Sequence, residues 1–487
     1  MMSDFLSPVA LVPALPLAGA VLAALVRDSR FGAYVTIAAA AGGFAAACLL
    51  PSEIGSTLFL LVDPVSAHLA MLTAFVGLTT AIYSRRYIAR ELETERLDET
   101  RVQRYHTVLL CFLGFMLLAL LSNNLGIAWV ALEAATISAV LGVGLPRTAE
   151  SIEASWKFFL ICGVGIALAL FGTVVLYLAA MPALGPGYGA MTWTELAQAA
   201  PQIRPTLLNL AFVFLLVGYG TKAGLVPLHS WMPDAHAEGP TPISAVLAGS
   251  VLNVALLLIM RLRGVMAANG QSIDPGPPLM ALGLFSVLLG AFSLWGRRDA
   301  KRFFAFSSIE QSGLAAFAIG LGGVGGTFAA LLHITVHTLA KSAVYQAVGR
   351  AAQRKGGQKF ADITGLIASD PALGLTLAAA IVAVAGLPPF GLFASEVLVL
   401  SETLRHAPLM APFLILGLLV GGWILLSRLV SLCLGAPTEA VGPAVNWVAL
   451  LPTWAHLAII AVLGFAMPSA VANWLVAAAR AIPGAAL

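Results

Sequence analysis

Long apolar stretches separated by short polar segments dominate this sequence. A helix that crosses a bilayer needs ~20 mostly apolar residues, and fourteen stretches approach that length. They lie at about residues 5–26, 31–50, 58–83, 106–122, 124–145, 155–180, 207–226, 242–260, 278–296, 303–322, 326–348, 371–401, 409–434 and 447–478. The pattern predicts an all-α polytopic membrane protein in which residues 1–487 form a single transmembrane domain of about 14 helices.

Composition supports a membrane protein and excludes several other classes. Hydrophobic residues make up 60% of the chain and charged residues only 10%, against roughly 25% charged residues in an average soluble domain. The sequence contains neither a P-loop nor a GxGxxG motif after a strand, so it predicts no nucleotide site. The four cysteines are scattered singly and form no cluster with ligand spacing. We therefore expect no cofactor or metal in this chain, and the net charge of +3 gives no reason to expect nucleic acid.

The basic residues predict an orientation in the membrane. Of the 26 Lys and Arg residues, seventeen lie in loops that follow odd-numbered spans and five lie on the other side. The positive-inside rule assigns the first set to the cytoplasm. We expect a multi-pass protein of the bacterial inner membrane with both termini on the periplasmic side.

Charged residues also occur inside the apolar stretches, where each costs at least ~2.5–3.5 kcal/mol. These residues are Glu133, Lys157, Lys222, Glu310, Lys341, Glu396 and Arg428. His333, His337 and Lys341 follow one another at intervals of four, which places them on one face of a helix. Such a set predicts a functional pathway, although Lys157 and Arg428 are also compatible with structural ion pairs between helices.

Glycine and proline predict breaks in the seventh and twelfth spans. The seventh contains GYGTKAGLVP around Lys222, and the twelfth contains AGLPPFG just before Glu396. Proline removes a backbone donor and clashes with the preceding turn. Broken helices are tolerated in a membrane only where they face protein or a wet cavity, so these breaks indicate an ion or substrate pathway.

The charged spans recur with an offset of five helices. Glu133 in the fifth span corresponds to Glu310 in the tenth, and Lys222 in the seventh corresponds to Glu396 in the twelfth. By the same offset, the pairs in the remaining spans are Lys157 with the His337/Lys341 face, and Asn253 with Arg428. An odd offset requires the second unit to be inverted. The sequence therefore predicts two inverted five-helix repeats, spans 4–8 (residues 105–262) and spans 9–13 (residues 277–434).

Lysine, glutamate and histidine side chains in this setting suit proton transfer. Desolvation disfavours a charged lysine, and a nearby carboxylate restores the charged form. Histidine can pass a proton between its two ring nitrogens. Alternating groups of these types near the membrane midplane would form a lateral proton pathway.

Several stretches resemble the antiporter-like subunits of respiratory complex I, of multisubunit cation/proton antiporters and of energy-converting hydrogenases. The densest is GTKAGLVPLHSWMPDAHAEGPTPISAVLAGS, and others are NNLGIAWVALEAATI, KRFFAFSSIEQSG and HITVHTLAKSAVY. The stretch ASWKFFLICGVGIALALFGTVVLYLAA looks most like hydrogenase-4 component F members. The resemblance implies fourteen helices with two inverted repeats. It also implies that Glu133, Lys157, Lys222, Glu310, His333, His337, Lys341 and Glu396 take part in proton translocation.

By this resemblance the chain would be a proton-translocating, non-catalytic subunit of a redox-driven complex of the hydrogenase-4/formate-hydrogenlyase type. Its partners would be other membrane subunits and a peripheral hydrogenase or dehydrogenase arm. Alternatives are a subunit of NADH–quinone oxidoreductase, of a cation/proton antiporter or of an inorganic-carbon transporter, or a structural scaffold that has lost conduction. One departure stands out: complex I relatives usually carry Lys or His near the position of Asn253. An asparagine cannot hold and release a proton there, so a continuous relay of the family type requires water or His229 to bridge the gap.

Overall fold

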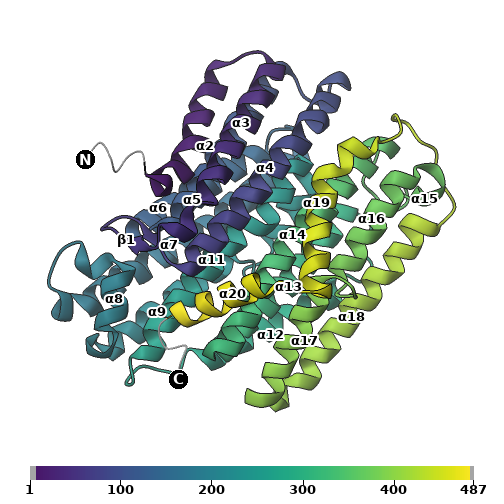
Figure 1. Cartoon of the computed structure of the whole chain (residues 1–487). Coiled ribbons are helices and arrows are strands. Elements are labelled where there is room, and N and C mark those ends of the chain that lie inside the picture. Colours follow the sequence, from purple (N-terminus) through teal and green to yellow (C-terminus); the bar gives the residue numbers. More distant parts are fainter. Residues whose placement is uncertain (1–6, 483–487) are drawn as a thin grey trace.

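The computed structural model describes residues 7–482. Its α-helices are α2 (Pro8–Leu25), α3 (Ser29–Ala47), α4 (Pro64–Glu93), α5 (Glu99–Leu121), α6 (Leu125–Val143), α7 (Ala149–Leu184), α8 (Trp193–Ala199), α9 (Pro205–Lys222), α10 (Trp231–Glu238), α11 (Thr241–Ala268), α12 (Gly276–Ser293), α13 (Ala300–Leu321), α14 (Gly323–Lys355), α15 (Leu366–Ser369), α16 (Pro371–Val384), α17 (Gly391–His406), α18 (Ala411–Leu429), α19 (Trp447–Phe465) and α20 (Ser469–Ala481). The two short strands β1 (Gly55–Ser56) and β2 (Leu61–Val62) pair antiparallel in a loop. The protein is thus the all-α membrane protein that the hydropathy pattern predicts (Figure 1).

Within residues 7–482, thirteen helices are long and apolar enough to cross a membrane. The shorter apolar helix α16 and the following α17 together supply the twelfth predicted span, which brings the total to the predicted fourteen. The last predicted stretch, 447–478, divides into α19 and α20, and α20 packs across α4 and α14. The start of the first predicted span at residue 5, and both chain termini, lie outside the described residues.

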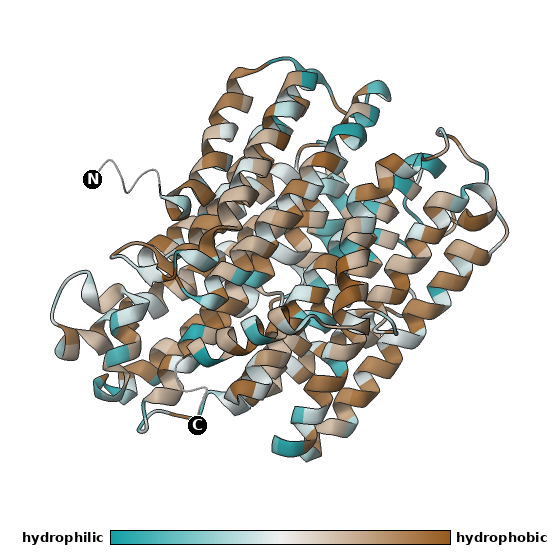
Figure 2. Cartoon of the chain, in the orientation of Figure 1, coloured by the Kyte–Doolittle hydropathy of each residue, from teal (hydrophilic) through white to brown (hydrophobic). Residues whose placement is uncertain are grey.

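The core is formed by α11, α13 and α14. Every residue in the most apolar 18-residue stretch of α11 is buried, and nearly all of the corresponding stretch of α13 is buried as well. Helices α2, α3 and α18 lie at the outside of the bundle, where their apolar side chains are exposed (Figures 1 and 2). Polar side chains in α11, α13 and α14 are therefore far from water, whereas the outer helices present an apolar surface of the kind that faces lipid.

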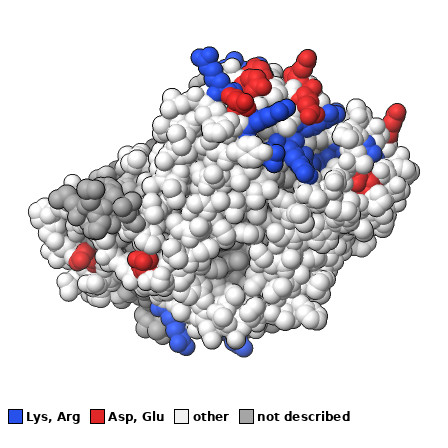
Figure 3. Space-filling view, turned by 45° about the horizontal axis from the view of Figure 1, so that its top comes forward, with Lys and Arg blue, Asp and Glu red and all other residues white. Residues whose placement is uncertain are grey.

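Charged side chains gather at one end of the molecule and are sparse over its flanks (Figure 3). Basic residues from the loops after the third and eleventh predicted spans meet there, because Arg86, Arg90, Arg350 and Arg354 line one pocket. We call this the basic end. This cluster of basic residues agrees with the sequence, in which most Lys and Arg residues lie in loops that follow odd-numbered spans.

The two predicted helix breaks are present. The seventh span divides into α9 and α10, and the twelfth divides into α16 and α17. Helix α7 packs against both halves of the first broken span, and α14 packs against both halves of the second. These equivalent surroundings fit the inverted relation between residues 105–262 and 277–434, which stays a prediction.

Candidate functional site

The first break places a lysine at the end of a helix inside the core. Helix α9 ends at Lys222, and the chain turns at Gly224, whose φ of 71° suits glycine. A side chain at Gly224 would also collide with Met232. Trp231, the first residue of α10, donates its indole hydrogen to the Thr221 carbonyl at 2.9 Å, which satisfies one of the free acceptors at the end of α9.

Lys222 is fully buried and has two polar partners on α6. Its Nζ donates to Glu133 Oε2 at 3.1 Å and to Thr136 Oγ1 at 2.7 Å. Glu133 and Thr136 are three residues apart, so they lie on the same face of α6. The lysine side chain has no exposed surface, whereas that of Glu133 is 18% exposed. The carboxylate is therefore the member of the pair that reaches the outer surface of the bundle, on a face of α6 that also exposes Val130 and Ile137.

The second break positions a carboxylate instead. Glu396 lies in the second turn of α17, and Gln311 Nε2 on α13 donates to its Oε1 at 3.5 Å. Gly386, in the break, has a φ of 66°, and a side chain there would overlap the Glu396 carboxylate. The glycine thus makes room for Glu396.

His333 links α13, α14 and α17. Its Nε2 lies 3.1 Å from the Gln311 carbonyl, and its Nδ1 lies 3.0 Å from Ser395 Oγ. A carbonyl only accepts, so Nε2 carries a hydrogen. Ser395 can either donate to Nδ1 or donate to the Leu392 carbonyl at 2.8 Å and accept from Nδ1. The surroundings of His333 therefore suit both the neutral and the protonated ring.

His337 and Lys341 continue the column along α14 as predicted. The rings of His333 and His337 are nearly parallel, with centroids 6.1 Å apart. His337 Nε2 is buried and has no hydrogen-bond partner among the described residues. Lys341 is fully buried and donates to the Phe304 carbonyl at 2.9 Å. No carboxylate within residues 7–482 forms an ion pair with Lys341, which distinguishes it from Lys222.

Glu310 on α13 is also buried. Its Oε2 has no hydrogen-bond partner among the described residues. Gly290 on α12 and Gly421 on α18 leave the space that it occupies, because a side chain at Gly421 would overlap the carboxylate. We call Glu133, Lys222, Glu310, His333, His337, Lys341 and Glu396 the buried polar series.

Asn253 lies where the two halves meet. Thr338 on α14 donates its hydroxyl hydrogen to Asn253 Oδ1 on α11 at 3.0 Å. The helices approach closely here, since a side chain at Gly249 would collide with Thr338. Asn253 Nδ2 is buried and lacks a partner among the described residues. At this contact between α11 and α14, a neutral amide and not a titratable group joins the two halves.

His229 does not close this gap by direct contact. It lies in the segment between α9 and α10 and is partly buried. Its Nδ1 is buried and makes no hydrogen bond to any of the described residues. The expected bridge through His229 therefore has no direct hydrogen bond in support.

The prediction that Lys157 is buried among these groups is wrong in its position. The Lys157 side chain is 47% exposed, and its Nζ lies 2.6 Å from Glu153 and 3.2 Å from Asp234. Asp234 also pairs with Arg302 at 3.0 Å. Helix α7 begins at Ala149, six residues before the predicted span. Lys157 therefore lies near the start of this helix, which is at the basic end of the molecule. It belongs to a partly exposed network of ion pairs.

Arg428 lies within the thirteenth span, as predicted, because the helix continues past α18 through a π-helical segment (Val430–Leu434) to the predicted end of the span. It lies in the last turn of α18, where its guanidinium contacts the face of the Phe360 ring at 4.7 Å and donates to the Arg297 carbonyl at 3.5 Å. Its contacts are those of a residue that anchors α18 at the basic end.

Sequence reasoning missed the neutral members of the site. Thr136, Gln311 and Ser395 bond directly to charged or imidazole groups of the buried polar series. A weak signal existed, because Gln311 and Ser395 adjoin Glu310 and Glu396 in the sequence, and Thr136 follows Glu133 by three residues.

Comparison with known proteins identifies the class to which this site belongs. The family model described as NADH:quinone oxidoreductase/Mrp antiporter, TM, matches residues 122–421. This range contains every member of the buried polar series. The chain belongs to this family of antiporter-like membrane proteins.

Individual proteins show which members of the family this chain resembles. A hydrogenase-4 component F homolog from Methylacidiphilum infernorum is 48% identical over 85% of this chain and 87% of its own length. NADH-quinone oxidoreductase subunit N from Geotalea uraniireducens is 29% identical over 84% of this chain and 85% of its own. The fold is also that of a chain in the membrane-bound sulfane sulfur reductase, an archaeal respiratory membrane complex, with a TM-score of 0.86, 21% identity and 98% of both chains covered. The protein is an antiporter-like membrane subunit related to components of hydrogenase-4 and of NADH–quinone oxidoreductase.

Proposed function

We propose that this protein translocates protons across a bacterial inner membrane as a subunit of a redox-driven complex of the hydrogenase-4/formate-hydrogenlyase type. The contact between Lys222 and Glu133 is the observation that carries the proposal. A lysine without exposed surface is costly in a membrane core, and its cost is offset only while the carboxylate remains close. Any movement that separates the two groups therefore favours release of a proton from Lys222.

In the second half, the imidazoles would carry the proton. His333 can gain and lose a proton at Nδ1, because Ser395 can act as either donor or acceptor there, while Nε2 keeps its hydrogen bond to the Gln311 carbonyl. His337 and Lys341 would exchange protons with Glu310, whose carboxylate lies beside α18 within the second repeat, and Glu396 would receive them at the second break. The partly exposed Glu133 would connect the first repeat to the outer surface of the bundle, where a neighbouring membrane subunit could pack. Water molecules would have to complete the path past Asn253.

We choose a complex of the hydrogenase-4 type over NADH–quinone oxidoreductase because of the higher sequence identity. The hydrogenase-4 component F homolog shares 48% of residues with this chain, whereas NADH-quinone oxidoreductase subunit N shares 29% over a similar length. In our proposal, the partners are other membrane subunits and a peripheral redox arm. Electron transfer in that arm drives proton movement, and this chain itself binds no cofactor. The basic end faces the cytoplasm, and both termini are periplasmic.

Purification of the tagged full-length chain from its native membrane would test the assignment. We expect subunits of a hydrogenase, with nickel and iron–sulfur centres detectable by metal analysis. Recovery with a flavin- and NADH-linked dehydrogenase arm would support the NADH–quinone oxidoreductase alternative. Recovery with only cation/proton antiporter or carbon-uptake proteins would overturn the redox-driven assignment.

A further inference from the structure

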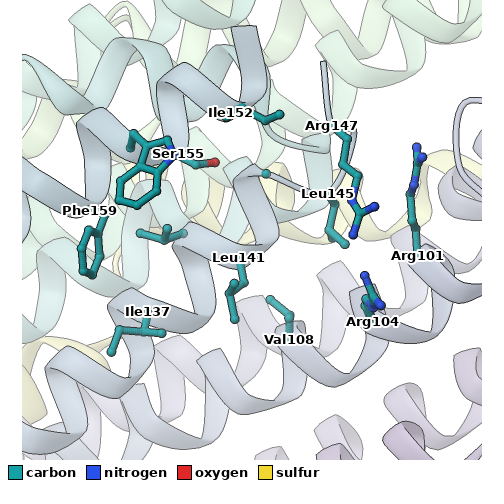
Figure 4. A pocket seen from close by; sticks show the side chains of 13 residues that line it. Arg101, Arg104, Val108, Ile137, Leu141, Leu145, Arg147, Ile152, Ser155 and Phe159 are labelled. Carbon is teal, nitrogen blue, oxygen red and sulfur yellow. The ribbon is translucent and has the colours of Figure 1, made fainter. Parts of the chain in front are cut away.

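An open groove lies between α5, α6 and α7 at the basic end, and no member of the buried polar series lines it. Its volume is about 640 Å³. Val108 of α5, Leu141 of α6 and Phe159 of α7 contribute to its apolar wall (Figure 4). Leu141 and Trp156, which also lines it, are each 59% exposed. The groove therefore opens on the outer surface of the bundle, where the membrane would contact it.

Three arginines border this groove on one side. Arg101 and Arg104 come from the first turns of α5, and Arg147 comes from the loop between α6 and α7 (Figure 4). Arg101 pairs with Asp98 at 3.1 Å and donates to the Pro146 carbonyl at 3.4 Å. Neither Arg104 nor Arg147 forms an ion pair with any of the described residues. Two guanidinium groups thus remain available beside an apolar cleft.

Arg147 is held in an unusual backbone conformation. Its φ is 57°, in the left-handed region that favours glycine, and it is one of two non-glycine residues with positive φ among residues 7–482. This turn directs the chain from α6 into α7 and places the Arg147 side chain at the edge of the groove.

We propose that this groove binds an anionic phospholipid, with its phosphodiester among Arg104 and Arg147 and an acyl chain along the apolar wall. Guanidinium groups bind phosphate oxygens through paired, charge-assisted hydrogen bonds. Basic pockets between helices at the cytoplasmic surface suit anionic headgroups, and the basic end would lie at that surface. Trp156 fits the level of the headgroups, where tryptophan is enriched. A single ligand with an anionic head and an apolar tail would satisfy both parts of the groove.

Fluorescence quenching by brominated lipids provides a direct test. The full-length chain would be reconstituted in phosphatidylcholine bilayers that contain increasing amounts of brominated phosphatidylglycerol or, in parallel, brominated phosphatidylcholine. The difference between the unmodified chain and Trp156→Phe isolates the signal of Trp156. We expect half-quenching of that signal at a several-fold lower fraction of the anionic lipid.

Arginine variants test the headgroup site. Arg104→Gln and Arg147→Gln should each weaken the preference for phosphatidylglycerol by about fivefold. The matched control is Arg27→Gln with Arg298→Gln, which removes two exposed arginines at the same end but outside the groove and should leave the preference unchanged. Equal loss in the control, or equal quenching by the two lipids, would overturn the proposal. Loss of Trp156 quenching in the intact native complex would also overturn it, because a partner subunit would then cover the groove.

Discussion

The two broken helices place opposite charges on opposite sides of their breaks. In the first half, Lys222 ends α9 and contacts Glu133 directly at 3.1 Å. In the second half, Glu396 follows the break, and its partner is the neutral amide of Gln311. Lys341, in the unbroken α14, donates to a backbone carbonyl. A direct ion pair holds a proton until the partner moves away, whereas a series of neutral polar groups needs an imidazole to pass the proton on.

The largest expected effect follows from breaking the direct pair. Lys222→Met should abolish proton translocation and lower the free energy of unfolding by about 3–5 kcal/mol, because it leaves a carboxylate without its buried partner. Dye-reported acidification of sealed vesicles measures translocation, and thermal unfolding of the purified protein measures stability.

A double variant separates stability from function at the same pair. Lys222→Met combined with Glu133→Gln removes both charges, so it should recover most of the lost stability while translocation stays absent. Recovery of translocation in the double variant would show that the pair is only structural.

A smaller loss of stability, but again a loss of translocation, is expected in the second half. His333→Gln keeps a polar amide between Gln311 and Ser395, so the free energy of unfolding should fall by only about 0.5–1.5 kcal/mol. Translocation should stop because an amide cannot accept and release a proton. His456 offers a matched control, since it is also buried and contacts Thr79 at 2.6 Å and the Leu339 carbonyl at 3.2 Å, outside the buried polar series. If His456→Gln abolished translocation equally, the specific role of His333 would be lost.

The junction between the halves should show a partial effect. Asn253→Leu and Thr338→Val each remove the same hydrogen bond, at a cost of about 1 kcal/mol. Only Asn253→Leu removes the unpartnered amide nitrogen that could hold a water molecule. We expect Asn253→Leu to slow vesicle acidification and Thr338→Val to leave it near the unmodified rate. Equal rates in the two variants would exclude a role for the amide.

The sequence predicts the fold well because membrane spans depend on length and apolarity alone. The breaks were also predictable, since Gly224 and Pro227, and the GLPPFG stretch of the twelfth span, carry local signals. The column of His333, His337 and Lys341 follows from helical spacing. Each of these features is encoded within one segment of the chain.

The neutral partners were not predictable, because their importance depends on packing between distant segments. Thr136 and Ser395 resemble many other small polar residues in membrane helices, and their contacts to Lys222 and His333 appear only when α6 meets α9 and α14 meets α17. The predicted position of Lys157 was wrong for the same reason. Hydropathy placed it in a span, but a charged first turn of α7 and Asp234 from α10 surround it.

Lys157 therefore gives the sharpest contrast with Lys222 and the smallest expected effect. Partly exposed ion pairs contribute about 0–1 kcal/mol, and salt screens them. Lys157→Met should leave vesicle acidification close to the unmodified rate. It should lower the free energy of unfolding by less than about 1 kcal/mol, and this difference should shrink as the salt concentration rises. Should Lys157→Met instead abolish acidification as Lys222→Met does, at low and high salt alike, a lysine at the basic end would be as essential as the buried one. Proton transfer would then have to include the network of Lys157, Asp234 and Arg302, and burial would no longer distinguish the residues that carry protons from those that hold the helices together.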